Sequence, residues 1–260
     1  SCFKALRLSR GGDLVICWLD LMGAMFSVIN LLNIKHVTVL ILNVMLPTIT
    51  GPRAVLRNAL YRVALRRNNV YYTVNNLELG RSYSSMLRIS NRNYFVLFDT
   101  SVYRPRSYVS SHVAVAQEYV FFGGRAGRDY ATAIKIAERC PNISFVFAVK
   151  RADFGRFMQK LPNNVMTIFD CEVEQFNYLL KESSLVMLPL KSDAPSGLIV
   201  LLTAAYYKKL VIATQTVTLE SYIVNGKSGI LLSNSDLDGW CYNVEKFLDE
   251  RDEKQKMVEA

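Results

Sequence analysis

The sequence predicts an α/β fold built from two Rossmann-like domains. Short apolar runs of strand type alternate along the chain with stretches of helical periodicity, the pattern of parallel sheets covered by helices. Glycine-containing turns follow two of these runs, where the strands of a parallel sheet would end and ligands bind. With 260 residues and a hydrophobic content of 51%, the chain is long enough for two packed cores.

Residues 1–110 are predicted to form an incomplete N-terminal domain on the acceptor side. An apolar stretch from Leu21 to Leu32 is shorter than the roughly twenty residues that cross a bilayer, so we expect a buried helix. The chain begins at Ser1 without the regions of a signal peptide, and we interpret it as a fragment that lacks the domain's opening strands and glycine loop. The other expected elements are strands at Val37–Leu46, Val70–Val74 and Tyr94–Phe98 and a helix at Arg53–Arg67.

Residues 111–260 are predicted to form the second domain, after a linker between Tyr103 and Gln117. Fully apolar runs of four to six residues are typical of strands that are buried on both faces of a sheet. The expected elements are strands at Tyr119–Phe122, Leu185–Leu190 and Leu210–Thr214 and helices at about Tyr130–Arg139 and Leu198–Tyr207.

The turn after the first of these strands favours a diphosphate. It reads Gly123-Gly124-Arg125-Ala126-Gly127-Arg128-Asp129. Two glycines allow a ligand to approach the backbone closely, and two arginines three positions apart can neutralise phosphate oxygens through directional bonds.

The second turn opens an apolar helix at Ser196-Gly197-Leu198. The first amides of a helix have no partner within it, so they attract an anion. A plain helix cap explains the same residues without any ligand, and considered alone this turn favours the cap. Two such turns at strand ends, however, could meet in one crevice.

These residues resemble the nucleotide-binding domain of GT-B glycosyltransferases, in particular the large retaining family called group 1 or family 4. The resemblance covers about Tyr119–Ala260 and depends most on Lys209–Thr214 and Glu220–Leu232. It implies a UDP- or GDP-sugar as substrate, with no other cofactor and no metal. The basic residues that it implies for the diphosphate are Arg125 and Arg128, and we predict a catalytic set of these two with Asp193, the only carboxylate near the helix opening. The implied donor-binding residues are Gly123, Gly124, Ser196, Gly197, Leu198, Cys171, Val173 and Glu220.

The chain departs from the family at two glutamates, eight positions apart, that bracket the helix opening. The first position falls on the Asp193–Pro195 turn and the second on Thr203. One interpretation is an active transferase in which Asp193 or Ser196 replaces the lost sugar contacts, acting in cell-surface polysaccharide synthesis on a glycan or lipid-linked acceptor. The other is a non-catalytic subunit that binds a nucleotide or a partner and supports an active transferase. A nucleotide-sugar epimerase would share the same architecture.

Charge is divided unevenly between the two halves. Residues 1–110 carry 14 Lys and Arg against 4 Asp and Glu, whereas the remainder carries 17 against 18. A basic amphipathic helix suits an anionic membrane surface, although a solvated face of an ordinary core-packed helix explains it equally well. Nucleic acid is disfavoured as a partner because no recognition module accompanies the charge. The basic residues of this helix are Arg53, Arg57, Arg62, Arg66 and Arg67.

Five scattered cysteines, an odd number without C-x-x-C spacing, indicate reduced thiols and a cytoplasmic protein, peripheral to the inner face of the plasma membrane if the basic helix binds lipid. Neither His36 nor His112 has a neighbouring cluster of carboxylates or cysteines. The sequence therefore predicts neither a histidine-rich zinc site nor a serine–histidine triad.

Overall fold

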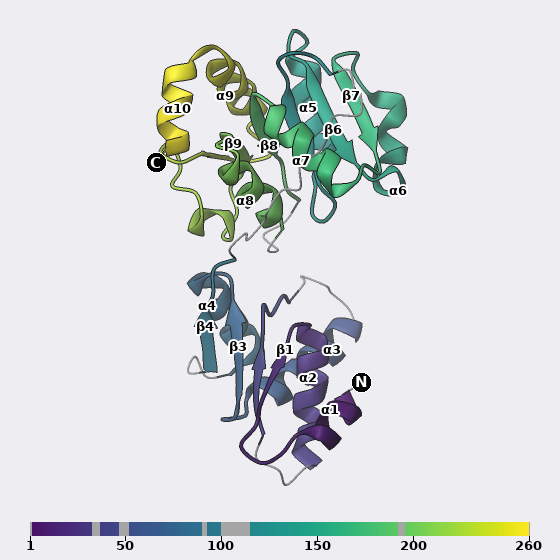
Figure 1. The fold of residues 1–260 in the computed structure, drawn as a ribbon, viewed down its shortest axis with the longest axis vertical. Helices are drawn as coiled ribbons and strands as arrows, with labels where there is room; N and C mark the ends of the chain where they lie inside the picture. The colour runs from purple at the N-terminus through teal and green to yellow at the C-terminus, as the bar shows by residue number, and fades with distance from the viewer. Residues whose placement is uncertain are drawn as a thin grey trace. The chain divides into compact units, whose positions relative to one another are not determined.

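The computed structural model describes residues 2–32, 37–46, 52–89, 93–99, 115–191 and 196–259. The chain divides into an N-terminal unit, Ser1–Asp99, and a C-terminal unit, Thr100–Ala260 (Figure 1). The predicted boundary at residue 110 and most of the predicted linker lie outside the described residues, so the boundary stays a prediction.

In the described part of the N-terminal unit, a parallel sheet of four strands has the order β1-β2-β3-β4. Its core lies between this sheet and helices α2, α3 and α4, with Phe26, Tyr61 and Tyr72 almost fully buried. The elements are α1 Cys2–Leu8, β1 Leu14–Cys17, α2 Asp20–Ile29, η1 Asn30–Leu32, β2 Thr38–Ile41, α3 Pro52–Leu65, β3 Val70–Val74, α4 Leu77–Leu87 and β4 Tyr94–Val96.

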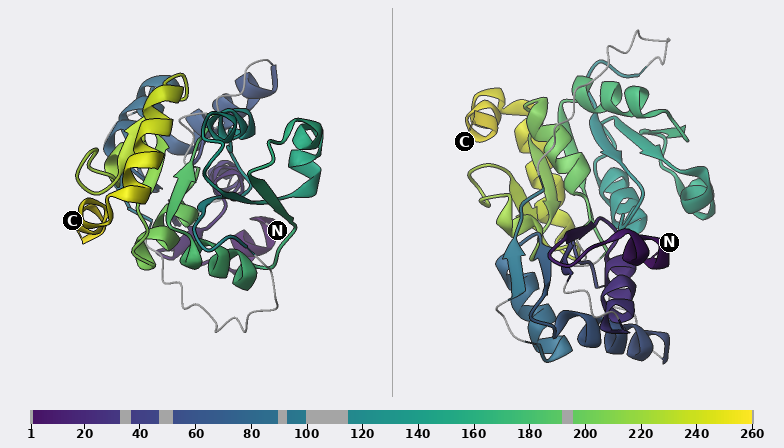
Figure 2. Two further views of the ribbon diagram at one scale, coloured as in Figure 1. Left: turned by 90° about the horizontal axis from the view of Figure 1, so that it is seen from above. Right: turned by 60° about the horizontal axis from the view of Figure 1, so that its bottom comes forward.

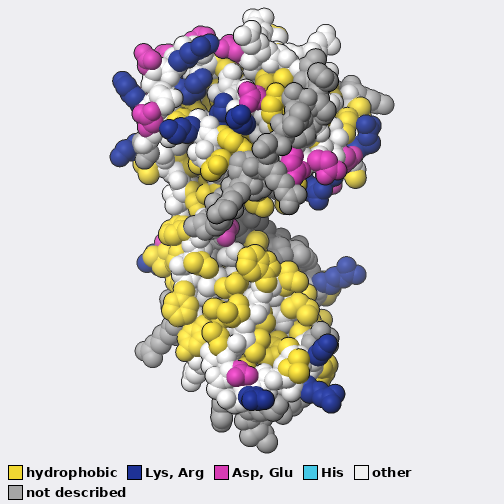
Figure 3. All heavy atoms as spheres, viewed as in Figure 1, with side chains coloured by type: hydrophobic (Ala, Val, Ile, Leu, Met, Phe, Trp, Pro, Cys, Tyr) yellow, Lys and Arg dark blue, Asp and Glu magenta, His cyan; other side chains and the backbone are white. Residues whose placement is uncertain are grey.

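The helix expected between Leu21 and Leu32 is present as α2 and η1, but it is not buried all round. Leu21, Met22 and Met25 are each at least 40% exposed, while Ala24 and Phe26 face the core. Strand β1 at the edge of the sheet also exposes Leu14 and Ile16. Figure 3 shows apolar side chains gathered on this unit. Among the described residues, no helix is long and apolar enough to span a membrane.

The C-terminal unit contains a parallel sheet of six strands in the order β10-β9-β8-β5-β6-β7. Strands β5, β6, β8 and β9 are buried at every residue because helices cover both faces of the sheet. The elements are β5 Val120–Gly123, α5 Tyr130–Arg139, β6 Phe145–Val149, α6 Arg151–Phe154, η3 Gly155–Lys160, β7 Val165–Phe169, α7 Val173–Glu182, β8 Leu185–Leu188, α8 Leu198–Tyr206, β9 Val211–Thr214, η4 Leu219–Ser221, β10 Ile230–Leu232, α9 Leu237–Asp249 and α10 Arg251–Glu259.

Two separate apolar clusters fill the two sides of this sheet. Helices α5, α6 and α9 pack on one face, and helices α7 and α8 pack on the other (Figures 1 and 2). The strand order reverses between β5 and β8, because the chain leaves β5 toward β6 and leaves β8 toward β9. In an open α/β sheet, ligands bind in the crevice beyond the strand ends at this point. The predicted class, an α/β fold of two Rossmann-like units, is confirmed.

Trp240 tests the packing on the α9 face. Its side chain is fully buried, and its Nε1 donates to the carbonyl oxygen of Ser233 at 3.0 Å. We expect Trp240→Ala to lower the free energy of unfolding by about 3–5 kcal/mol, since a large cavity opens in the core. Tyr242→Ala on the same helix, where the side chain is 62% exposed, should change it by about 0.5 kcal/mol or less. Urea denaturation followed by circular dichroism makes the comparison, and equal losses in the two variants would contradict this packing.

Candidate functional site

The turn between β5 and α5 is shaped around the side chain of Arg128. The guanidinium donates through Nε to the Gly123 carbonyl at 2.7 Å and through Nη1 to the Ala126 carbonyl at 2.8 Å. Gly124 has a φ of +108°, and a Cβ atom there would overlap this guanidinium. Glycine is therefore required at position 124 both for its backbone conformation and for the space that Arg128 occupies.

The same turn is fastened to the end of β8. The amide of Asp129 donates to the carbonyl of Pro189 at 3.0 Å, and the amide of Lys191 donates to the carbonyl of Gly127 at 2.8 Å. Arg128 and Leu190 form an isolated antiparallel bridge at this point. The two glycine turns thus meet at the reversal of strand order, which confirms their predicted convergence.

A network of side-chain hydrogen bonds supports this turn, and its members lie too far apart in the sequence for a local pattern to predict it. Asn234 donates to the Asp129 carboxylate at 3.0 Å and to the Leu190 carbonyl at 2.7 Å. Thr214 donates to the Asn234 side chain and accepts from the Leu190 amide. Asp129 also caps α5 by accepting from the amide and hydroxyl of Thr132. This network joins the ends of β5, β8, β9 and β10 and orients the turn.

Arg128 is a buried cation to which the described part of the chain supplies no counter-ion. Only 4% of its surface is exposed, and no carboxylate of the described residues forms an ion pair with it. Burial lowers the pKa of Arg128 to about 10, and the nearby Tyr130 acts in the opposite direction. The side chain therefore stays positively charged at neutral pH, and an anion beside it would offset the cost of its burial.

The start of α8 adds unpaired donors close to this turn. Gly197, with a φ of +86°, is the N-cap, and no side chain caps the helix. Ser196 does not act as the cap: its Oγ is buried and makes no hydrogen bond in the described part of the chain. A Cβ atom on Gly127 would lie 2.5 Å from that Oγ, so the two turns are in direct contact. The side chain of Leu198 packs in the core, which leaves only its backbone free for a ligand.

An apolar cavity of about 340 Å³ lies on the α7 and α8 side of the strand ends. Cys171 and Val173, which the resemblance implies as donor-binding residues, line this cavity. Burial raises the pKa of the Cys171 thiol, so the thiol is neutral at physiological pH. Thr203 also lines the cavity, and its hydroxyl donates to the carbonyl of Ile199 at 2.6 Å. At its rim Lys150 pairs with Asp170 at 3.1 Å.

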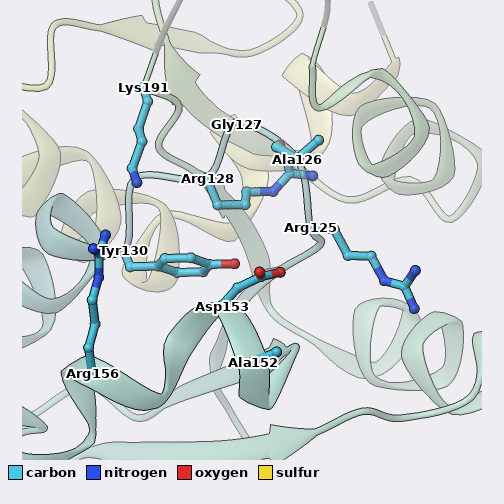
Figure 4. Close-up of a pocket in the computed structure, with 9 residues that line it drawn as sticks. All are labelled: Arg125, Ala126, Gly127, Arg128, Tyr130, Ala152, Asp153, Arg156 and Lys191. Carbon is cyan, nitrogen blue, oxygen red and sulfur yellow. The ribbon is translucent and has the colours of Figure 1, made fainter.

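A second cavity, of about 580 Å³, lies on the α5 and α6 side (Figure 4). Arg125 is exposed and belongs to the walls of both cavities, so it stands between them. The second cavity is lined by Arg125, Ala126, Gly127, Arg128, Tyr130, Ala152, Asp153, Arg156 and Lys191. It is strongly basic, with four cationic side chains against one carboxylate.

Other predicted residues lie elsewhere. Glu220, in η4, lines neither cavity and accepts from the side-chain amide of Gln215 at 2.6 Å. Asp193 lies outside the described residues. Within the described ranges, no three His, Cys, Asp or Glu side chains form a group that could hold a metal. The roles assigned to the individual site residues stay predictions.

Two arginines in and just after the basic helix α3 make hydrogen bonds within the N-terminal unit. Arg62 donates to the carbonyl of Leu87 at 2.8 Å, and Arg67, just beyond the helix, donates to the carbonyl of Ser27 at 2.9 Å. Arg53, Leu56 and Arg66 are exposed. Membrane binding by this helix stays a prediction.

Comparison with known proteins agrees with this architecture. The fold matches solved glycosyltransferases. Anabaena HepE in complex with UDP superimposes with a TM-score of 0.78 at 13% identity, over 99% of this chain and 74% of that one. Sucrose-phosphate synthase of Thermosynechococcus elongatus gives 0.73 at 13% identity, over 98% and 69%. WaaG, a glycosyltransferase involved in lipopolysaccharide biosynthesis, gives 0.65 at 14% identity, over 85% and 71%.

Residues 135–260, just under half of the chain, match the family model of glycosyl transferases group 1. The resemblance read from the sequence is thereby confirmed for this part of the chain. No curated protein matches the chain by sequence. At identities of 13–14%, the structural likeness establishes the fold and leaves the activity to be argued from the site.

The requirement for glycine at position 124 is testable. We expect Gly124→Ala to displace the Arg128 guanidinium and strain the turn, lowering the free energy of unfolding by about 1–3 kcal/mol. Gly155→Ala is the matched control, since a Cβ there meets nothing within 4 Å and the backbone is right-handed. Thermal denaturation of both variants decides the point; a Gly124→Ala protein as stable as Gly155→Ala would exclude the tight contact with Arg128.

Proposed function

We propose that this chain is a glycosyltransferase that takes its sugar from a nucleoside-diphosphate donor bound along the strand ends of the C-terminal unit. The observation that carries the proposal is the buried cation of Arg128 at the reversal of strand order, which has no ion-pair partner among the described residues. The start of α8 and an apolar cavity lie beside the same turn. A nucleoside diphosphate fits these groups: the cation and the helix amides can bind its diphosphate, and the apolar wall can contact its flat base.

The diphosphate would lie against three kinds of donor. Arg125 is exposed at the crevice and free to move onto phosphate oxygens, whereas Arg128 is fixed from behind by two carbonyls. The amides at the start of α8 and the unpaired hydroxyl of Ser196 supply hydrogen bonds that carry no charge of their own. The fixed cation of Arg128 can bind the diphosphate of the donor in the ground state. The mobile cation of Arg125 can move to stabilise the negative charge that develops on the leaving diphosphate.

The base would occupy the apolar cavity. Its walls include the neutral thiol of Cys171, the side chain of Val173 and the ring of Phe176. Such walls select a flat, largely apolar group, and the hydroxyl oxygen of Thr203 remains available as an acceptor for a ribose hydroxyl. The HepE structures contain UDP or UDP-glucose, which supports uridine as the nucleoside to test first.

Transfer would proceed without a metal, because arginine side chains and helix amides can neutralise the leaving diphosphate. We extend the proposal to a glycan or lipid-linked acceptor in cell-surface polysaccharide synthesis. The participation of WaaG in lipopolysaccharide biosynthesis supports this acceptor class. We also propose a cytoplasmic location, consistent with the five free cysteines.

A second function is favoured by one observation. Thr203 stands at one of the two positions where the family usually carries a glutamate, and its hydroxyl is already bonded to the Ile199 carbonyl. A protein with this site could bind the nucleotide and transfer nothing, as a supporting subunit would. UDP binding by a protein that never turns over a UDP-sugar, with any acceptor supplied, would establish this function in place of the first.

A substitution at Arg125 tests catalysis without disturbing the fold. It is exposed, so Arg125→Ala should change the free energy of unfolding by about 0.5 kcal/mol or less. We expect the same change to slow UDP release from a UDP-sugar by about 100-fold or more, as the loss of one oxyanion donor does. Arg128→Lys keeps the charge but loses the planar fork, and should slow turnover without abolishing UDP binding. Lys135→Ala, on the exposed side of α5, is the control. Normal turnover in both arginine variants would remove this turn from the mechanism.

Val173 tests the base pocket. Its side chain is 58% exposed at the wall of the apolar cavity, so a substitution there leaves the core intact. We expect Val173→Asp to weaken UDP binding about tenfold or more, because a carboxylate replaces apolar contact and repels the nucleotide. Val224→Asp is the matched control, at a valine that is 62% exposed and outside the cavity. Calorimetric titration with UDP would show equal affinities if the base bound elsewhere.

A further inference from the structure

The basic cavity between α5, α6 and the end of β8 has a volume of about 580 Å³. Three of its side chains come from separate elements: Tyr130 begins α5, Arg156 lies in η3, and Lys191 follows β8. In Figure 4 the charged ends of Arg156 and Lys191 turn toward one another, on the far side of Tyr130 from Arg125. Two cations that converge on one space repel each other unless an anion lies between them.

The charge of this cavity is not balanced within the described residues. Its side chains carry four positive charges and the single negative charge of Asp153, and none of the five takes part in an ion pair there. Lys191 and Arg156 instead make weak cation–π contacts: Lys191 lies 5.8 Å from the ring centre of Tyr130, and Arg156 lies 4.8 Å from that of Phe157. A surplus of three positive charges facing one space attracts a doubly charged anion.

Tyr130 provides an independent sign of a ligand. Its residue surface is only 4% exposed, and its buried hydroxyl has no hydrogen-bond partner in the described part of the chain. Burial, and secondarily the charge of Asp153, raises the pKa of Tyr130, so at neutral pH the hydroxyl keeps its proton and can donate. Buried hydroxyls of native proteins are normally paired, and an unpaired one at a basic cavity needs an acceptor.

The cavity faces away from the proposed base pocket. Tyr130 and Phe154, which flank it, belong to the apolar cluster on the α5 and α6 face of the sheet, whereas Phe176 in the base pocket packs against the cluster on the opposite face. Arg125 is the side chain that the two cavities share, together with the edge of the glycine turn. One nucleotide that runs from the apolar cavity to the start of α8 therefore leaves Arg156 and Lys191 unoccupied.

We propose that this cavity is a second anion site, which binds the phosphate of a phosphomonoester while the nucleotide occupies the donor site. Arg156 and Lys191 hold the phosphate oxygens by charge-assisted hydrogen bonds. The Tyr130 hydroxyl points to the other end of the cavity, toward Asp153 and Arg125 (Figure 4), where it donates to an oxygen of the group that carries the phosphate. A volume of about 580 Å³ accommodates a body of monosaccharide size behind the phosphate. The proposal names a ligand class beyond the nucleotide sugar and does not depend on turnover.

The test is calorimetric titration with inorganic phosphate and with glucose 6-phosphate, at constant ionic strength, in the absence and presence of saturating UDP. We expect both to bind, and to bind equally well when UDP is present. The double variant Arg156→Ala/Lys191→Ala should weaken their binding about tenfold or more and leave UDP affinity unchanged. Both side chains are exposed, and a matched control, Lys135→Ala/Lys256→Ala, removes the same charge at exposed positions outside the cavity.

Tyr130→Phe provides a second variant that keeps the buried ring and removes only the hydroxyl; it should weaken glucose 6-phosphate binding without a change in UDP affinity. Displacement of phosphate by UDP would overturn the proposal, because the cavity would then be part of the donor site. Unchanged phosphate affinity in the double variant would overturn it as well. Phosphate binding that is lost in the double variant, in a protein that does not bind UDP at all, would support this site and refute the donor site.

Discussion

The buried guanidinium of Arg128 is the constraint on which the site depends. Its two bonds to backbone carbonyls fix the curvature of the turn after β5, and the space that it fills excludes any side chain at Gly124. The turn can hold this curvature only because β8 and the Asp129–Asn234 network fasten it from two directions. The position of one cation is thus determined by four strand ends, and the cation in turn determines where an anion can bind.

This arrangement costs stability. The pKa of Arg128 in the folded chain is about 10, below its ordinary value, so folding destabilises the protonated, charged form of the side chain. The cost is fully present at neutral pH and is relieved only as the pH rises through about 10. A bound anion relieves it at neutral pH, since it favours the charged form. Stability lost at such a position is therefore regained on binding, the expected signature of a binding site and not of a structural ion pair.

The sequence was sufficient to predict the parts of this site that are local. Val70–Val74 and Tyr130–Arg139 were predicted with their observed bounds, because apolar runs and a capping aspartate act over a few residues. Asn234 could not be found in this way: it lies 105 positions from Asp129, and only the order of the strands brings the two together. The Tyr130, Arg156 and Lys191 cluster was missed for the same reason. Exposed residues of α2 were misjudged because periodicity does not reveal which face remains uncovered.

The presence of Thr203, where the family usually has a glutamate, is compatible with catalysis. In this reaction class the protein's main task is to stabilise negative charge on a leaving diphosphate, and preorganised cations and amides perform it. Those groups are held by the backbone of β5, β8 and α8, whereas a carboxylate at position 203 would contact the donor's hydroxyls. Its loss thus weakens donor binding and specificity before it weakens departure of the diphosphate. Under the proposed function, the neutral wall at Thr203 would therefore serve recognition of the donor, and the positive charge around Arg125 and Arg128 would serve departure of the diphosphate.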